Sequence, residues 1–171
     1  MNLDKLFKIF SDNNCKKVYA KRLAANDNSK NQVYFGGSFE VLNILPIKDV
    51  SAEGSSKGKD IRFKSKLDFY WVNDEGLLSY VPNAQLILYH QYPEVRFSGF
   101  LNGCRDKPSA LMSSRLENRL LFLGISSDGN ILGYVVAPDS GISLAFDKLE
   151  DLGALGVFKE ISINKGGFAK A

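Results

Sequence analysis

The sequence has one histidine, two cysteines and no Cys-x-x-Cys pair in its 171 residues. A structural zinc site needs four Cys or His ligands, so His90, Cys15 and Cys104 cannot make one. We expect two free, buried thiols, as in a cytosolic protein. No apolar run approaches the length that spans a membrane, and the first ten residues are too polar for a signal peptide. These absences predict a soluble protein of the cytoplasm.

Signatures of catalysis are also missing. Metal-dependent nucleases commonly place carboxylates and a lysine around a divalent ion, with a Glu-x-Lys motif, and the chain has no Glu-x-Lys. Gly36 and Gly37 lack the lysine and the spacing of a phosphate-binding loop, and no nucleophile elbow lies near His90. We predict a non-catalytic chain that holds no metal and no cofactor. A nuclease with an unusual carboxylate set, including Asp60 or Asp68, is the alternative.

The chain is 44% hydrophobic, with twelve Phe and seven Tyr, and its net charge of +3 is only mildly basic. Its hydrophobic periodicity predicts short helices over residues 3–10, 39–45 and within 138–153, and loops at 49–60 and 99–114. It predicts strands at Val18–Tyr19 and Val33–Phe35, and over residues 61–72, 85–91, 95–98, 119–125, 131–137 and 157–163.

This pattern predicts a mainly β fold of about seven strands with short flanking helices, either a barrel or pseudobarrel, with a sandwich left open. Asp128 and Gly129, between two apolar runs, predict a tight hairpin. We expect a single domain over residues 1–164 and the start of a linker or tail at 165–171.

A polar loop separates the first two predicted strands. Asn, Asp and Ser favour turns, so a solvated hairpin loop is one interpretation. Arg, Asn and Gln are also side chains that contact base edges in DNA, and Lys contacts phosphates. On the second interpretation the candidate DNA-binding residues of this loop are Lys21, Arg22, Asn26, Asp27, Asn28, Lys30 and Gln32.

A second polar and aromatic segment lies between residues 89 and 107. Arg can grip guanine with two hydrogen bonds, Glu accepts from cytosine, and Gln or Asn can pair with adenine. Glu94 and Arg96 could equally form a surface ion pair, His90 could be structural, and Arg105 and Lys107 could be solvated cations. The candidate DNA-binding residues here are His90, Gln91, Tyr92, Glu94, Arg96, Ser98, Asn102, Arg105 and Lys107.

The run Val-Tyr-Ala-Lys-Arg-Leu-Ala-Ala-Asn-Asp over residues 18–27, then Gln-Val and an apolar segment ending at Pro46, closely resembles the EcoRII N-terminal effector-domain family. The resemblance is close over residues 17–46 and looser over 85–98 and 117–137. The family is a pseudobarrel found in type II restriction endonucleases and is related to the plant B-three domains. The segment 94–101 is also similar to N-terminal domains fused to MvaI-like nucleases. The chain departs from the EcoRII pattern at Tyr92, Pro93 and Glu94, and in a long insertion at 99–114.

The resemblance implies that the two polar loops are arms that clamp the major groove of double-stranded DNA at a CCWGG-type site, where W is A or T. Lys30, Arg105 and Lys107 would hold phosphates. It further implies a bacterial cytoplasmic protein whose isolated domain is monomeric and whose parent chain continues into a separate nuclease domain, where Mg²⁺ would bind. A protein-interaction β-domain with two merely solvated loops is the alternative from another class.

Overall fold

The computed structural model describes residues 1–24, 27, 31–35, 43, 45–54, 61–89, 94–101, 104, 106–112, 117–147 and 159–161. Several predictions lie outside these residues. They concern most of the helix at 39–45 and the candidate site residues Asn26, Asn28, Lys30, His90, Gln91, Tyr92, Asn102 and Arg105.

The described residues form a mainly β fold, as the sequence predicts, with eleven strands in two sheets. One sheet has six strands in the order β11-β1-β9-β10-β5-β6 and the other has five in the order β2-β8-β7-β4-β3. The prediction of about seven strands is therefore wrong in number. The elements are α1 (Leu3–Asp12), β1 (Cys15–Arg22), β2 (Gln32–Tyr34), β3 (Lys48–Gly54), β4 (Ile61–Lys66), β5 (Asp68–Val72), β6 (Leu78–Tyr80), β7 (Gln85–Tyr89), β8 (Glu94–Ser98), η2 (Ser109–Leu111), β9 (Leu120–Ser126), β10 (Asn130–Val136), α3 (Gly141–Asp147) and β11 (Lys159–Ile161).

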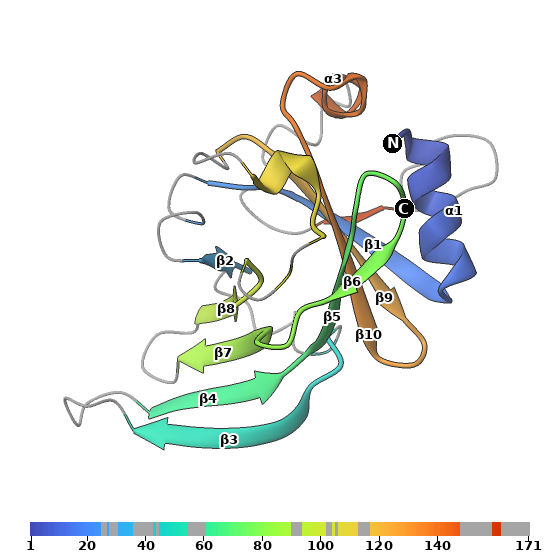
Figure 1. The fold of residues 1–171 in the computed structure, drawn as a ribbon. Helices are drawn as coiled ribbons and strands as arrows, with labels where there is room; N and C mark the ends of the chain where they lie inside the picture. Colours follow the sequence, from blue (N-terminus) through green and yellow to red (C-terminus); the bar gives the residue numbers. More distant parts are fainter. Residues whose placement is uncertain are drawn as a thin grey trace.

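The six-stranded sheet is covered on both faces. Figure 1 shows α1 beside β1, β9 and β10, whereas β2, β8, β7, β4 and β3 lie on the other side. Successive residues of β9 point to opposite faces of the sheet. Leu121 packs in the core cluster shared with the five-stranded sheet, and Phe122 packs in the cluster beneath α1. A strand buried on both faces needs apolar residues throughout, and β9 and β10 have that composition.

Helix α1 confirms the prediction from the apolar spacing. Its N-cap Asn2 accepts a hydrogen bond from the backbone N–H of Lys5 at 2.8 Å, which satisfies a donor that has no partner within the helix. Leu6 and Phe10 are fully buried under the helix. The contact fixes α1 on the six-stranded sheet, away from the five-stranded one.

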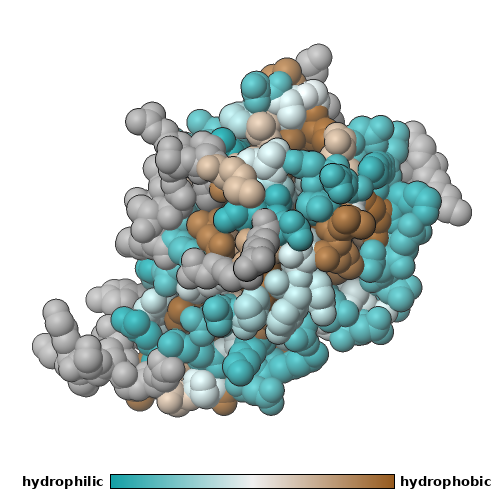
Figure 2. All heavy atoms as spheres, viewed as in Figure 1, coloured by the Kyte–Doolittle hydropathy of each residue, from teal (hydrophilic) through white to brown (hydrophobic). Residues whose placement is uncertain are grey.

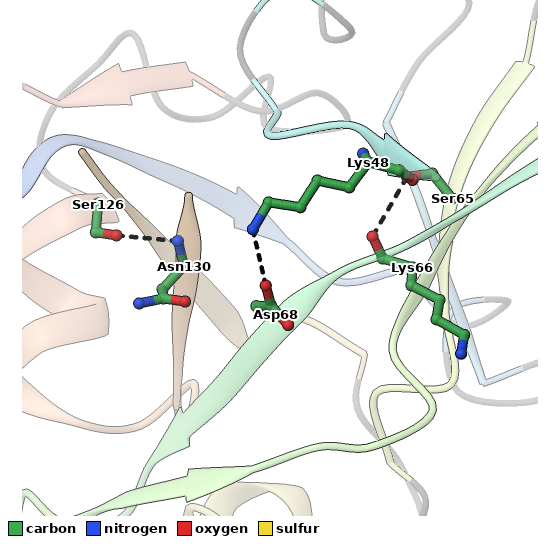
Figure 3. A network of polar contacts seen from close by, with 6 residues as sticks. All are labelled: Lys48, Ser65, Lys66, Asp68, Ser126 and Asn130. Carbon is green, nitrogen blue, oxygen red and sulfur yellow. Dashed lines mark hydrogen bonds and ion pairs between the residues drawn. The ribbon is translucent and has the colours of Figure 1, made fainter. Parts of the chain in front are cut away.

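The predicted strand over residues 61–72 is in fact two strands that belong to different sheets. The chain leaves the five-stranded sheet at Leu67, whose N–H bonds to the carbonyl of Ala84 at 3.0 Å, and enters the six-stranded sheet as β5. At this junction Lys48 Nζ pairs with Asp68 at 2.9 Å, and the Ser65 hydroxyl bonds to the backbone of Lys48 (Figure 3). The Lys48–Asp68 pair joins the two sheets where one strand passes between them, whereas the Ser65 contact lies within the five-stranded sheet.

The prediction of a loop at 49–60 is wrong for its first part, because residues 48–54 form β3. This strand lies at the edge of its sheet and pairs with β4. An edge strand with exposed side chains has no apolar alternation, so its polar sequence is typical of a loop. Strand β6 is short and was not predicted.

The predicted hairpin is confirmed, with Gly129 of its turn at a positive φ of 83°. Both cysteines are free and buried, as expected, and burial raises the pKa of the Cys15 thiol to about 11. Among the helices that the structure describes, none is long and apolar enough to cross a membrane.

Candidate nucleic-acid interface

The outward face of the five-stranded sheet is polar and basic. Residues that oppose one another in a sheet share a face, and the register joins Arg62 to Tyr89 and Glu94 in one row, and Lys64 to Ile87, Arg96 and Tyr34 in the next. The intervening residues, such as Leu86, Val95 and Phe97, are buried in the core. Ile87 lies in the same rows but is apolar and buried. We call the remaining outward set the polar face; its residues are Gln32, Tyr34, Arg62, Lys64, Lys66, Gln85, Tyr89, Glu94, Arg96 and Ser98.

Three predicted site residues meet on this face. The guanidinium of Arg96 donates to Glu94 Oε1 from Nε at 2.5 Å and to Gln32 Oε1 from Nη1 at 2.8 Å. Gln32 ends the first polar loop, and Glu94 and Arg96 lie in the second polar segment. The hydrogen bond between Gln32 and Arg96 therefore joins residues that are 64 apart in the chain. The hydrogen bond with Glu94 raises the pKa of Arg96 above its usual value. The side chains of Arg96 and Glu94 stay 23% and 22% exposed.

Tyr89 lies between two guanidinium groups. The Cζ atoms of Arg62, on β4, and Arg96, on β8, each lie 4.9 Å from the centroid of its ring. Cations over an aromatic face are attracted by its quadrupole, which favours both guanidinium groups at this ring. Neither Arg62 nor Tyr89 was among the predicted site residues. The alternation of Arg62, Lys64 and Lys66 in the sequence was the available signal, but only the pairing of β4 with β7 connects it to Arg96.

Two other predicted site residues, Lys21 and Asp27, are buried. Lys21 Nζ lies 3.4 Å from Asp27 Oδ2, and their side chains are 2% and 4% exposed. Asp27 also accepts from the N–H groups of Ala24 at 2.7 Å and Tyr34 at 3.2 Å, while Lys21 donates to the carbonyl of Tyr34 at 2.5 Å. Burial lowers the pKa of Lys21 despite the attraction of Asp27. The prediction that Lys21 and Asp27 face DNA is at odds with this burial, and the pair instead ties the start of the loop to its return strand.

The remaining described site residues are more scattered. Arg22 turns toward α3 and the segment just before β9, donating to the carbonyl of Asn118 at 2.8 Å and to the Ser143 hydroxyl at 3.1 Å. Ser98 lies on the polar face opposite Gln32. Lys107 is half-buried just before η2. The structure therefore brings Gln32, Glu94, Arg96 and Ser98 together, and places Arg22 and Lys107 elsewhere.

The acidic residues considered for a nuclease are placed only in part. Asp68 is engaged by Lys48 at the sheet junction, and Asp60 lies outside the described residues. Within the described ranges no three His, Cys, Asp or Glu side chains gather in a way that could hold a metal ion.

A scan of the chain against protein-family models finds no match. A search of curated proteins likewise finds no matching sequence.

Proposed function

We propose that this chain is a sequence-specific double-stranded DNA-binding domain, the effector or recognition part of a type II restriction endonuclease. The observation that supports it is the Gln32–Arg96–Glu94 network, in which half-buried residues from the two predicted arms share one face of the sheet. In this proposal the two sheets correspond to the family's pseudobarrel, and the site is of the CCWGG type.

The chemistry of the network suits base recognition in the major groove. A guanidinium carries five N–H groups, and Arg96 donates one from Nε to Glu94 and one from Nη1 to Gln32, while Nη2 lies 2.5 Å from Glu94 Oε1. At least one N–H therefore remains on each terminal nitrogen, and such a pair can bind O6 and N7 of guanine. Glu94 and Gln32 hold the guanidinium plane in place, so less side-chain entropy is lost on binding.

The buried pair Lys21–Asp27 has a supporting role in this proposal. It closes the base of the first loop by joining β1 to β2, and so sets where Gln32 enters the polar face. The base and phosphate contacts of this arm then come from its other candidates. The domain itself would need no Mg²⁺, which would serve a separate nuclease domain of the parent chain.

The test is a titration of this chain with two fluorescent duplexes, one carrying CCWGG and one with the site scrambled, across a salt series. Preference for the first, with affinity that falls steeply as salt rises, is the expected result. Lys107→Ala tests the predicted phosphate contact, and should lower the salt slope by about one without changing the preference. Equal binding of both duplexes, together with no preference in a selection from random DNA, would contradict the proposal.

One observation favours a second candidate, a protein-interaction domain. Strand β6 lies at the edge of the six-stranded sheet, and Leu77, Leu78 and Tyr80 are 62%, 41% and 48% exposed there. Figure 2 shows hydrophobic residues in separate patches among hydrophilic ones on one side of the molecule. An exposed apolar edge can accept a strand from a partner. Absence of DNA binding at every salt concentration would favour this candidate.

A further inference from the structure

Strand β4 places a row of cations on the polar face, outside the two predicted arms. Arg62, Lys64 and Lys66 alternate with inward residues, so all three point to the side that carries Arg96. Alternate residues of a strand are about 6.8 Å apart, so the row extends over about 14 Å. The row is opposed on β3 by Ser51 and Lys48, and by one acidic position, Glu53. The row on β4 and the residues that oppose it on β3 therefore carry more positive than negative side chains.

The end residues of the row have no carboxylate hydrogen-bonded to them among the described residues. Arg62 stacks on Tyr89, and its Nε is buried without a hydrogen-bond partner. Lys66 is exposed, and its side chain extends away from the Lys48–Asp68 pair (Figure 3). Elsewhere on the surface, Lys8, Lys17 and Lys48 each pair with a carboxylate. A cation without such a partner can bind an external anion without first breaking an ion pair.

The position of the row suits the wall of a DNA groove. Strands lie about 4.8 Å apart, so β4, two strands from β8, is about 10 Å from Arg96. The major groove is about 12 Å wide. If Arg96 contacts base edges close to one wall of the groove, β4 then faces the phosphates of the opposite wall. Phosphate oxygens are the partners that arginine and lysine most commonly bind in DNA complexes.

We infer that the outward side of β4, with Arg62 and Lys66, is a phosphate-binding surface that extends the DNA interface beyond the two arms. The inference rests on the proposed function, because the partner is the same duplex. Tyr89 couples the two parts by holding the phosphate-binding Arg62 and the base-reading Arg96 against one ring.

The experiment compares Arg62→Gln, Lys66→Gln and the double variant with the wild-type chain on the CCWGG and scrambled duplexes. Each single change should reduce the slope of log K against log salt by about 0.9, so affinity changes about threefold less between 50 and 200 mM salt. The loss should be the same on both duplexes. Lys16→Gln is the matched control, since Lys16 is exposed on β1, in the other sheet, and its removal should leave the slope unchanged.

The outcomes separate this inference from the proposed function. If Arg96→Ala abolishes the preference for CCWGG while the β4 variants keep the wild-type slope, only the inference is overturned. A change in sequence preference in Arg62→Gln would overturn its assignment to phosphates. If the wild-type chain binds no DNA, both fail. Lys66 is exposed, so Lys66→Gln remains informative even if Arg62→Gln is unstable, and Trp71 fluorescence checks the fold of each variant.

Discussion

The buried pair Lys21–Asp27 should dominate the stability of the first loop. At 3.4 Å, two unit charges attract by about 5 kcal/mol at an effective dielectric constant of about 20. Most of this attraction offsets the cost of removing both ions from water. Replacing one partner leaves the other charge buried without its counter-ion, which is strongly unfavourable. Lys21→Met should therefore lower the free energy of unfolding by about 3–5 kcal/mol. That is a large part of the roughly 5–15 kcal/mol available to a domain.

The assay is urea unfolding followed through Trp71, the single tryptophan, which is fully buried and donates to the carbonyl of Phe100 at 2.7 Å. Lys21→Met, Asp27→Asn and the double variant form a thermodynamic cycle. Because the double variant leaves no uncompensated charge, its loss should be smaller than the sum of the single losses by about 1–3 kcal/mol.

The matched control is the ion pair of Lys8 and Asp12, at 2.5 Å, whose side chains are 73% and 58% exposed. Solvent screens this pair, so Lys8→Met should change stability by less than about 1 kcal/mol. If Lys21→Met costs no more than Lys8→Met, or if the cycle is additive, the reasoning about the buried pair is refuted.

Three further predictions concern pH, base recognition and packing. Burial lowers the pKa of Lys21, so between that pKa and 10.5 the unfolded chain binds more protons than the folded one. The stability of the wild-type chain should therefore rise relative to that of Lys21→Met as the pH increases toward 10.5. A constant difference between the unfolding free energies of the two proteins at every pH would contradict this. Arg96→Ala should cost about 1–3 kcal/mol on CCWGG and relax specificity, whereas equal losses on random DNA would make Arg96 a phosphate contact. Gly133→Ala places a methyl group 2.5–2.9 Å from two core rings and should destabilise by about 1–3 kcal/mol, while Gly141→Ala, with open space around it, should not.

Local patterns in the sequence predict local structure well in this chain. The apolar spacing of residues 3–10 predicts α1, and Asp128 and Gly129 predict the β9–β10 hairpin, because a helix face and a two-strand turn depend on neighbours in the chain. The alternation of residues 61–72 predicts an extended segment correctly. It gives no sign of the sheet change at Leu67, since that depends on Ala84 and on the pairing of β5 with β10.

The sequence predicts which types of side chain the candidate site contains better than it predicts where each of them lies in the fold. Arg96, Glu94 and Gln32 have the side chains that base recognition needs, and they do meet. Lys21 and Asp27 also have suitable types, but ions that are so thoroughly buried are rare, so sequence alone places them at the surface. Arg62 was missed because its proximity to Arg96 depends on three strands aligned in one sheet.

The position of β1 has a consequence for folding kinetics. Its only strand partners in the described sheet are β9 and β11, so its first partner lies about 100 residues further along the chain. Closing a loop of that length costs entropy before any pairing compensates for it. On a ribosome β1 has neither neighbour until most of the chain has emerged, and we expect refolding in milliseconds to seconds, as for other folds dominated by distant pairings. Until then the strand that leads into the first polar loop is an unpaired segment, open to chaperones and to aggregation.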